Sequence, residues 1–268
     1  VAKFIVIEST YSHSGTKKKL NFNINDYPKF KDKIIYLVID EEPQDIIPLI
    51  GKENNPSNKR QNSIKRIELS YNFMSKAITD ADDSDLIILS DNDEIPNLNS
   101  EKFKSSKKDY FIFKQLLFYY KFNYLHEAMP WFGSKACKKK RLKSFSSLRN
   151  LKNKKYPFWR FDTYFNKNKQ VNIDIIDNGG WHFTNIKSPK DLFEKLSNFG
   201  HHDEFDESGV SIDFLKEKID KGEVFYNHEL DKSNLNKWND SFKLTKVDLE
   251  ILPTFLQENK KKYIEWLV

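Results

Sequence analysis

The sequence has little cysteine, little glycine or proline, and no long hydrophobic run. Its 268 residues include one cysteine, Cys137, which excludes an internal disulfide framework and a zinc site built from several cysteines. No apolar run approaches the roughly 20 residues that a membrane-spanning helix needs. With 8 Gly and 9 Pro, the chain contains no collagen-like or linker-like stretch.

The composition that is present predicts a folded chain with a sizeable core. Aromatic residues make up 15% of the chain and hydrophobic residues 38%, whereas disordered chains are poor in aromatics. The length suits one large domain or two small ones. A net charge of +6 is compatible with nucleic acid, an anionic surface or a phosphorylated small molecule as partner, and composition does not choose among them.

The first residues, VAKFIVIE, already have the pattern of a buried strand. Chain termini usually lie at the surface, so we expect further residues upstream of Val1. No leader or transit sequence precedes the strand. Together with the single cysteine, this predicts a cytoplasmic location for the chain as given, and a lumenal or membrane-anchored full-length protein stays open.

Strand and helix patterns alternate in the first third of the chain. Apolar residues from Arg60 to Thr79 follow a helical spacing. Short apolar runs predict strands at Phe4–Ile7, Ile34–Ile39 and Leu86–Leu89. The order strand, strand, helix, strand indicates an α/β fold with a mostly parallel sheet and helices on both faces.

The remaining two thirds continue this mixed pattern. Residues 109–122 predict two strands, and further strands are expected at 171–176 and 181–183. The Ser-Pro start signal predicts a helix at 188–197, and a short helix is expected at 211–221. Residues 247–267 predict a helical tail, interrupted at Pro253 and packed on the rest. Without a repeat or a linker, residues 1–268 are expected to form a single domain.

The strongest chemical signal is the run Ser90-Asp91-Asn92-Asp93-Glu94-Ile95-Pro96. Asp-x-Asp occurs three times in this chain, but only Asp91/Asp93 directly follows a buried strand, where open α/β sheets bind ligands. Three acids in four residues repel each other, and a hard divalent ion would relieve that repulsion. A turn or helix start with Pro96 in its first turn is the alternative.

Two further segments carry groups suited to catalysis. Paired glycines in Gly179-Gly180-Trp181-His182 permit positive φ and a close approach of the backbone to a ligand, and His182 offers an imidazole to a metal. A turn before a strand explains the same pattern. The segment from Lys195 to Phe205 holds a cation, two histidines and two acids, suited to phosphate binding and base catalysis. A polar helix end would look similar.

These motifs together resemble glycosyltransferase family 17. SDNDEIP, FYYKFN at Phe118–Asn123, GGWHF and the segment from Lys195 occur in that order, between FIVIESTYSHSGTKKKLNF and LPTFLQENKKKY. The resemblance covers Phe4 to about Tyr263. It implies a GT-A fold, UDP-N-acetylglucosamine as donor, Mn²⁺ or Mg²⁺, and inverting transfer to a mannose of a glycan. The family pattern begins with another strand and helix, and its animal members carry a membrane anchor, neither of which this chain contains.

The resemblance also implies roles for individual residues. Asp91 and Asp93 match the Asp-x-Asp element and His182 the histidine of the Gly-Trp-His element, which makes these three the expected metal ligands. Glu8 matches the acid that closes an early strand near the uridine. The expected donor-binding residues are Glu8, Ser9, Arg60, Asp91, Asn92, Arg149 and Lys195. Of these, Arg149 and Lys195 would neutralise the departing diphosphate.

Inverting transfer needs a carboxylate that takes the proton of the acceptor hydroxyl. Glu204 is the first candidate, because it follows the paired histidines, and Asp203, Asp177 and Glu127 are rivals. Aromatic residues could form a sugar platform, or belong to the core: Trp131, Tyr124 and Trp181. Pro130 and Gly133 place Trp131 in a loop, so it is expected to be the most exposed of them.

Two other functional classes stay open. A metal-dependent nuclease or phosphotransferase could use Asp91, Asp93, Glu94 and His182, and it would cleave nucleic acid without a sugar nucleotide. A non-catalytic module could bind glycan or nucleic acid through the basic run Lys138–Lys143 and the aromatics, and its binding would survive Asp93→Ala. The glycosyltransferase interpretation expects no nucleic-acid partner and no membrane segment in this chain.

Overall fold

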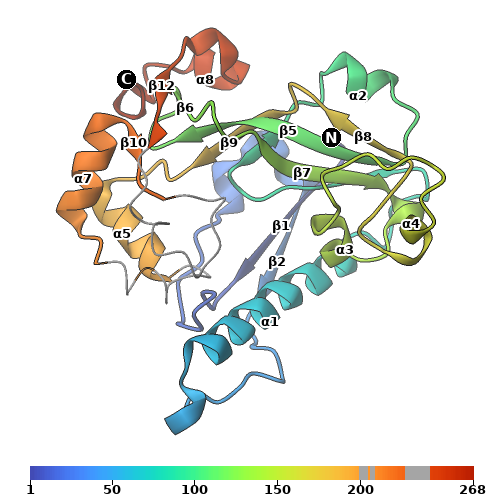
Figure 1. Ribbon diagram of the computed structural model, residues 1–268, viewed down its shortest axis with the longest axis horizontal. Coiled ribbons are helices and arrows are strands. Elements are labelled where there is room, and N and C mark those ends of the chain that lie inside the picture. The colour runs from blue at the N-terminus through green and yellow to red at the C-terminus, as the bar shows by residue number, and fades with distance from the viewer. Residues whose placement is uncertain (199–204, 206–208, 227–241) are drawn as a thin grey trace. The chain divides into compact units, whose positions relative to one another are not determined.

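The computed structural model describes residues 1–198, 205, 209–226 and 242–268 (Figure 1). The chain divides into two compact units. Unit 1 comprises Val1–Asp82, Ser144–Ser146 and Glu194–Glu207, and unit 2 comprises Asp83–Lys143, Ser147–Phe193 and Ser208–Val268.

Unit 1 is built on two parallel strands, β1 (Phe4–Ser9) and β2 (Ile34–Ile39), as their apolar runs predicted. The helix α1 (Pro56–Met74) contacts both strands. It begins earlier than predicted, because the Asn55 side chain caps its N-terminus and Pro56 occupies its first turn. Short 3₁₀ turns complete the unit at Ile24–Asp26, Pro28–Lys33, Gly51–Glu53 and Ser75–Ala77.

Unit 2 is organised around one long strand, β5 (Tyr110–Tyr119), where the sequence predicted two. On one side, β5 pairs antiparallel with β7 (Trp131–Lys138) and β6 (Tyr124–Leu125). On the other side, it pairs in parallel with β8 (Ile173–Ile176) and then with β9 (Gly180–Thr184). Figure 1 shows β5 running between these neighbours.

The sheet of unit 2 is mixed, which corrects the prediction of a mostly parallel sheet. The strand β3 (Leu86–Leu89) exists as predicted, but it pairs antiparallel with β7, with Leu86 opposite Lys138. The strand β7 has no clear apolar pattern, since glycine, serine and lysine interrupt its apolar residues. The strand β7 lies between β3 and β5 and is antiparallel to both, so the sheet is not mostly parallel. The fold is therefore mixed α/β, and the finer GT-A arrangement stays a prediction.

The remaining elements are short. Helices are α2 (Glu101–Ser105), α3 (Phe145–Arg149), α4 (Asp162–Phe165), α5 (Pro189–Asn198), α7 (Ile212–Lys221) and α8 (Thr254–Glu258). Ser211 caps α7 and Gly222 ends it in the left-handed conformation, and the helix lies where a short helix was expected. Small strands are β4 (Glu94–Pro96), β10 (Glu223–Val224), β11 (Phe242–Lys243) and β12 (Thr245–Lys246), and 3₁₀ turns lie at Lys139–Arg141, Leu249–Ile251 and Ile264–Trp266.

Two apolar clusters form the core of unit 2. Phe111, Phe113, Ala136 and Ile176 join the middle strands. Phe118 and Phe183 meet Leu252 and Leu256, so the C-terminal segment packs on β5 and β9. Among the described residues, no helix has both the length and the apolar character needed to cross a membrane.

Candidate functional site

The site centres on Asp93 and His182, which lie far apart in sequence. The strand β4 pairs antiparallel with β9, with Glu94 opposite His182. The Asp93 carbonyl accepts a hydrogen bond from the Phe183 amide at 2.8 Å. The side chains meet as a result: Asp93 Oδ2 lies 3.3 Å from His182 Nε2. The sequence nominated both residues but gave no sign of β4, the strand that joins them.

His182 is buried and held from one side by an aromatic ring. Its imidazole centroid lies 4.5 Å from that of Trp131. Its Nδ1 is buried and has no hydrogen-bond partner among the described residues. Buried polar atoms are nearly always paired, because an unpaired one costs about 1–3 kcal/mol. The imidazole therefore has unused capacity to bond a proton donor, a water or a metal.

Asp91 faces a guanidinium group rather than Asp93. Arg149 Nη2 donates to Asp91 Oδ2 at 2.7 Å, and Arg149 Nη1 lies 3.8 Å from Glu94 Oε1. Buried Lys135 fixes the turn after α3 by donating at 2.7 Å to the carbonyls of Arg149 and Leu151. Burial, and then the charge of Arg149, lower the pKa of Lys135 to about 8. Asn92 lies exposed in the turn between Asp91 and Asp93.

Glu94 is the buried centre of a hydrogen-bond network beneath these residues. It accepts from Trp131 Nε1 at 2.8 Å, from the Asp91 amide at 3.2 Å and from Ser134 Oγ at 3.3 Å. Ser134 in turn accepts from Ser90 and Gln115. Burial, and then the charge of Asp91, raise the pKa of Glu94. The sequence pattern placed Glu94 among the acids that a divalent ion would relieve and among the nuclease ligands, not as a buried acceptor. Ser134 and Lys135 were missed because their strand was not predicted.

The two glycines before Trp181 allow neighbouring backbones to approach closely, whereas the sequence predicted a close approach to a ligand. Gly180 has φ +118°, and a Cβ there would collide with the Ile95 carbonyl oxygen on β4. A Cβ on Gly179 would lie 2.6 Å from the Lys114 amide nitrogen on β5. Glycine at both positions lets β9 pair with β4 and β5 at once, which brings His182 to Asp93.

The candidates Glu8, Ser9, Arg60 and Lys195 belong to unit 1. Glu8 lies next to the last residue of β1. Its carboxylate accepts hydrogen bonds from Lys18 Nζ at 2.9 Å, from Tyr36 Oη at 3.0 Å and from the amides of Asn21 and Phe22. Ser9 Oγ accepts from the Tyr11 amide. Arg60 lies on α1 and Lys195 on α5. A uridine role for Glu8 stays a prediction, since its carboxylate already binds its own unit.

Glu8 makes unfolding depend on pH. Burial alone would raise its pKa, but the bonds from Lys18, the two amides and Tyr36 lower it from 4.5 to about 2. A carboxyl group with a lowered pKa in the folded state stabilises the fold at any pH above its unfolded pKa. This contribution to the free energy of unfolding is therefore lost as pH falls from 4.5 to about 2. Denaturant unfolding across that range should show a steeper loss for the native chain than for Glu8→Gln. Equal slopes would contradict this.

Two of the four base candidates, Asp177 and Glu127, do not join the site. Asp177 follows β8, is exposed and pairs with Lys102 at 2.8 Å, and the bond from Lys102 lowers its pKa. Glu127 is exposed in the turn after β6. Glu204 and Asp203 lie outside the described residues.

The aromatic candidates are placed differently from expectation. Trp131 belongs to strand β7 and is half-buried, which corrects its expected exposed loop position, because its indole reaches Glu94. Trp181 donates to the Ile251 carbonyl and contacts the cluster around Phe118, and half-buried Tyr124 lies in β6.

The Asp93–His182 pair offers one carboxylate and one imidazole to a divalent ion. Among the described residues, no group of three or more His, Cys, Asp or Glu side chains is arranged to hold a metal. Asp93 and His182 do lie together, and a carboxylate–imidazole pair suits Mn²⁺ or Mg²⁺ better than a soft metal. The chemistry of this pair fits, and further ligands would come from Asp91 or from a phosphate of the donor.

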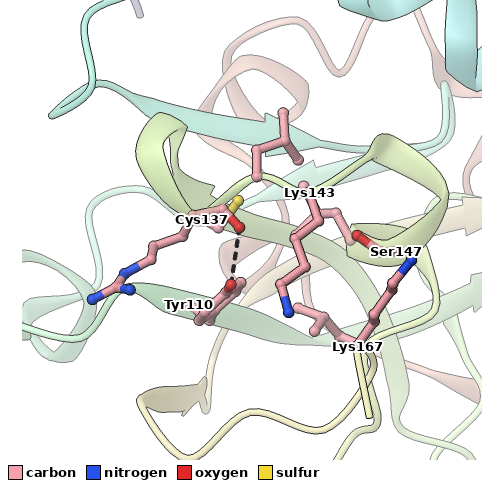
Figure 2. A pocket seen from close by; sticks show the side chains of 9 residues that line it. Tyr110, Cys137, Lys143, Ser147 and Lys167 are labelled. Carbon is pink, nitrogen blue, oxygen red and sulfur yellow. Dashed lines mark hydrogen bonds between the residues drawn. The ribbon is translucent and has the colours of Figure 1, made fainter. Parts of the chain in front are cut away.

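A pocket in unit 2 lies elsewhere. It is a small hollow, far below the roughly 300 Å³ of ordinary ligand sites. Figure 2 shows Tyr110, Cys137, Lys143, Ser147 and Lys167 around it. The site carboxylates are not in its lining, so it is not the donor site.

Comparison with known proteins places the chain in a class of sugar-transferring enzymes. The family model described as Glycosyltransferase family 17 matches residues 1–267. The chain therefore belongs to glycosyltransferase family 17, and this membership implies a nucleotide-sugar donor and a glycan acceptor. No curated protein and no solved structure gave a significant match.

Proposed function

We propose that this protein is an inverting, divalent-metal-dependent transferase that moves N-acetylglucosamine from UDP-N-acetylglucosamine to a glycan hydroxyl, with mannose as the accepting sugar. The observation that carries the proposal is the β4–β9 pairing, which brings Asp93 within 3.3 Å of His182 in a chain of this family. Asp93 and His182 would hold the ion, with Asp91 or a donor phosphate completing its ligands, and the ion would supply positive charge to the diphosphate leaving group.

The chain's own residues supply the rest of the proposed site. Arg149 offers a second positive charge beside Asp91, suited to a phosphate oxygen. Lys135 orders the turn that carries Arg149, and Glu94 orders the Asp91 backbone. Trp131 packs on the His182 ring and fixes its orientation. The acceptor proton goes to a carboxylate, for which Glu204 remains the first candidate.

Calorimetric titration tests the donor site directly. UDP and UDP-N-acetylglucosamine are titrated into the protein with Mn²⁺ and then with EDTA, for the native chain and for Asp93→Ala. We expect binding with Mn²⁺ that EDTA abolishes and that Asp93→Ala weakens about tenfold or more. Metal-dependent cleavage of nucleic acid without nucleotide-sugar binding would favour the nuclease alternative instead.

A further inference from the structure

Residues 156–165, YPFWRFDTYF, form an exposed aromatic segment of unit 2. Its rings at positions 158, 159, 161, 164 and 165 are between 65% and 90% exposed. Contiguous apolar surface of this kind is rare on soluble proteins and marks an interaction site. The segment is nevertheless anchored: Thr163 is buried and donates to the Arg160 carbonyl at 2.6 Å.

Basic residues surround the aromatic segment. Residues 152–169 contain six basic side chains and one acid, Asp162. That acid is already paired, with Arg160 at 2.7 Å and with Lys169 at 2.6 Å. Lys155 pairs with Asp174 in β8. The surface around the rings therefore keeps a clear positive charge, carried by Lys152, Lys154 and Lys167.

The small pocket adjoins this segment through Lys167, which follows Phe165 by two positions. Lys143, Lys167 and Ser147 stand at its rim in Figure 2. Leu142, Leu148 and Leu151 also line it. The hollow is too small for a lipid chain, so Lys143 and Lys167 contribute positive charge at the surface beside the segment.

We propose that the aromatic segment docks this enzyme on a bilayer that contains anionic lipids. Aromatic rings are favoured at the membrane interface, and neighbouring Lys and Arg bind anionic headgroups. A sugar stacks on one or two ring faces, whereas here adjacent Phe158 and Trp159 meet edge to face at 83° and further rings extend the surface. The surrounding positive charge selects an anionic surface over a neutral partner.

Vesicle co-sedimentation tests the proposal. The whole protein is mixed with vesicles of phosphatidylcholine alone or with added phosphatidylglycerol. We expect salt-sensitive binding to the anionic vesicles only. Replacing three rings, Trp159→Ser, Phe161→Ser and Phe165→Ser, should lower the bound fraction about tenfold or more. Phe255→Ser in α8 is the matched control, since Phe255 is 58% exposed outside the segment, and its binding should match the native chain.

A measurement on the native protein makes the test independent of the variants' folding. Brominated lipids should quench its tryptophan fluorescence in anionic vesicles, because Trp159 enters the interface. No vesicle binding, or equal binding by the triple variant, would overturn the proposal. Two lipid-free results would also overturn it. Loss of transfer to soluble glycan acceptors in the triple variant would indicate that the rings form a sugar platform. Loss of a dimer that the native protein forms would indicate that the rings mediate self-association.

Discussion

Asp93→Asn should lower kcat/KM for transfer from UDP-N-acetylglucosamine by about 100-fold or more. The substitution keeps the shape of the side chain and removes its charge next to His182, which lies 3.3 Å away. The Asp93 side chain is 28% exposed, so its loss should change the free energy of unfolding by less than about 1 kcal/mol. Donor hydrolysis and transfer to mannose-terminated glycans measure the activity.

Two variants show whether the effect belongs to this pair. Asp80→Asn changes the first Asp-x-Asp, which lies in a polar turn of unit 1, and should leave the rate near that of the native chain. The double variant Asp93→Asn with His182→Asn should be no slower than the slower single variant, because the two side chains act as one unit. Native rates in Asp93→Asn, or fully additive losses, would contradict a shared role.

Glu94→Ala should lower the free energy of unfolding by about 2–4 kcal/mol. Truncation removes the acceptor of the Trp131 indole, the Asp91 amide and the Ser134 hydroxyl, and leaves a cavity under the site. Burial, and then the charge of Asp91, raise the pKa of this carboxyl, which means that the site disfavours its negative charge. Its stabilising effect therefore comes from accepting these hydrogen bonds. Denaturant unfolding at neutral pH measures the loss.

The matched control is Glu101→Ala, since Glu101 is an exposed acid in the first turn of α2. This substitution should lower the free energy of unfolding by well under about 1 kcal/mol. Glu94→Gln keeps the volume and one acceptor, and should restore most of the stability lost in Glu94→Ala. Unchanged stability in Glu94→Ala would show that the network around Ser134 and Trp131 rearranges without it. Such a result would remove Glu94 from the account of how Asp91 is positioned.

Local sequence patterns predicted several elements well. The apolar runs predicted β1, β2 and β3, and the Ser-Pro start signal predicted α5. These signals work because they depend on neighbours in the chain: alternation, helical spacing and capping. The strands β4 and β7 carry weak local patterns, so they could not be predicted, and the mostly parallel sheet was wrong for that reason.

The sequence by itself determined the family and the acidic run after a buried strand. Only the tertiary structure decided which side chains meet. Asp93 reaches His182 because β4 pairs with β9, and Asp91 turns to Arg149 because Lys135 holds the turn after α3. Local propensity acts within a few residues, whereas these contacts depend on backbone pairing and burial between distant segments.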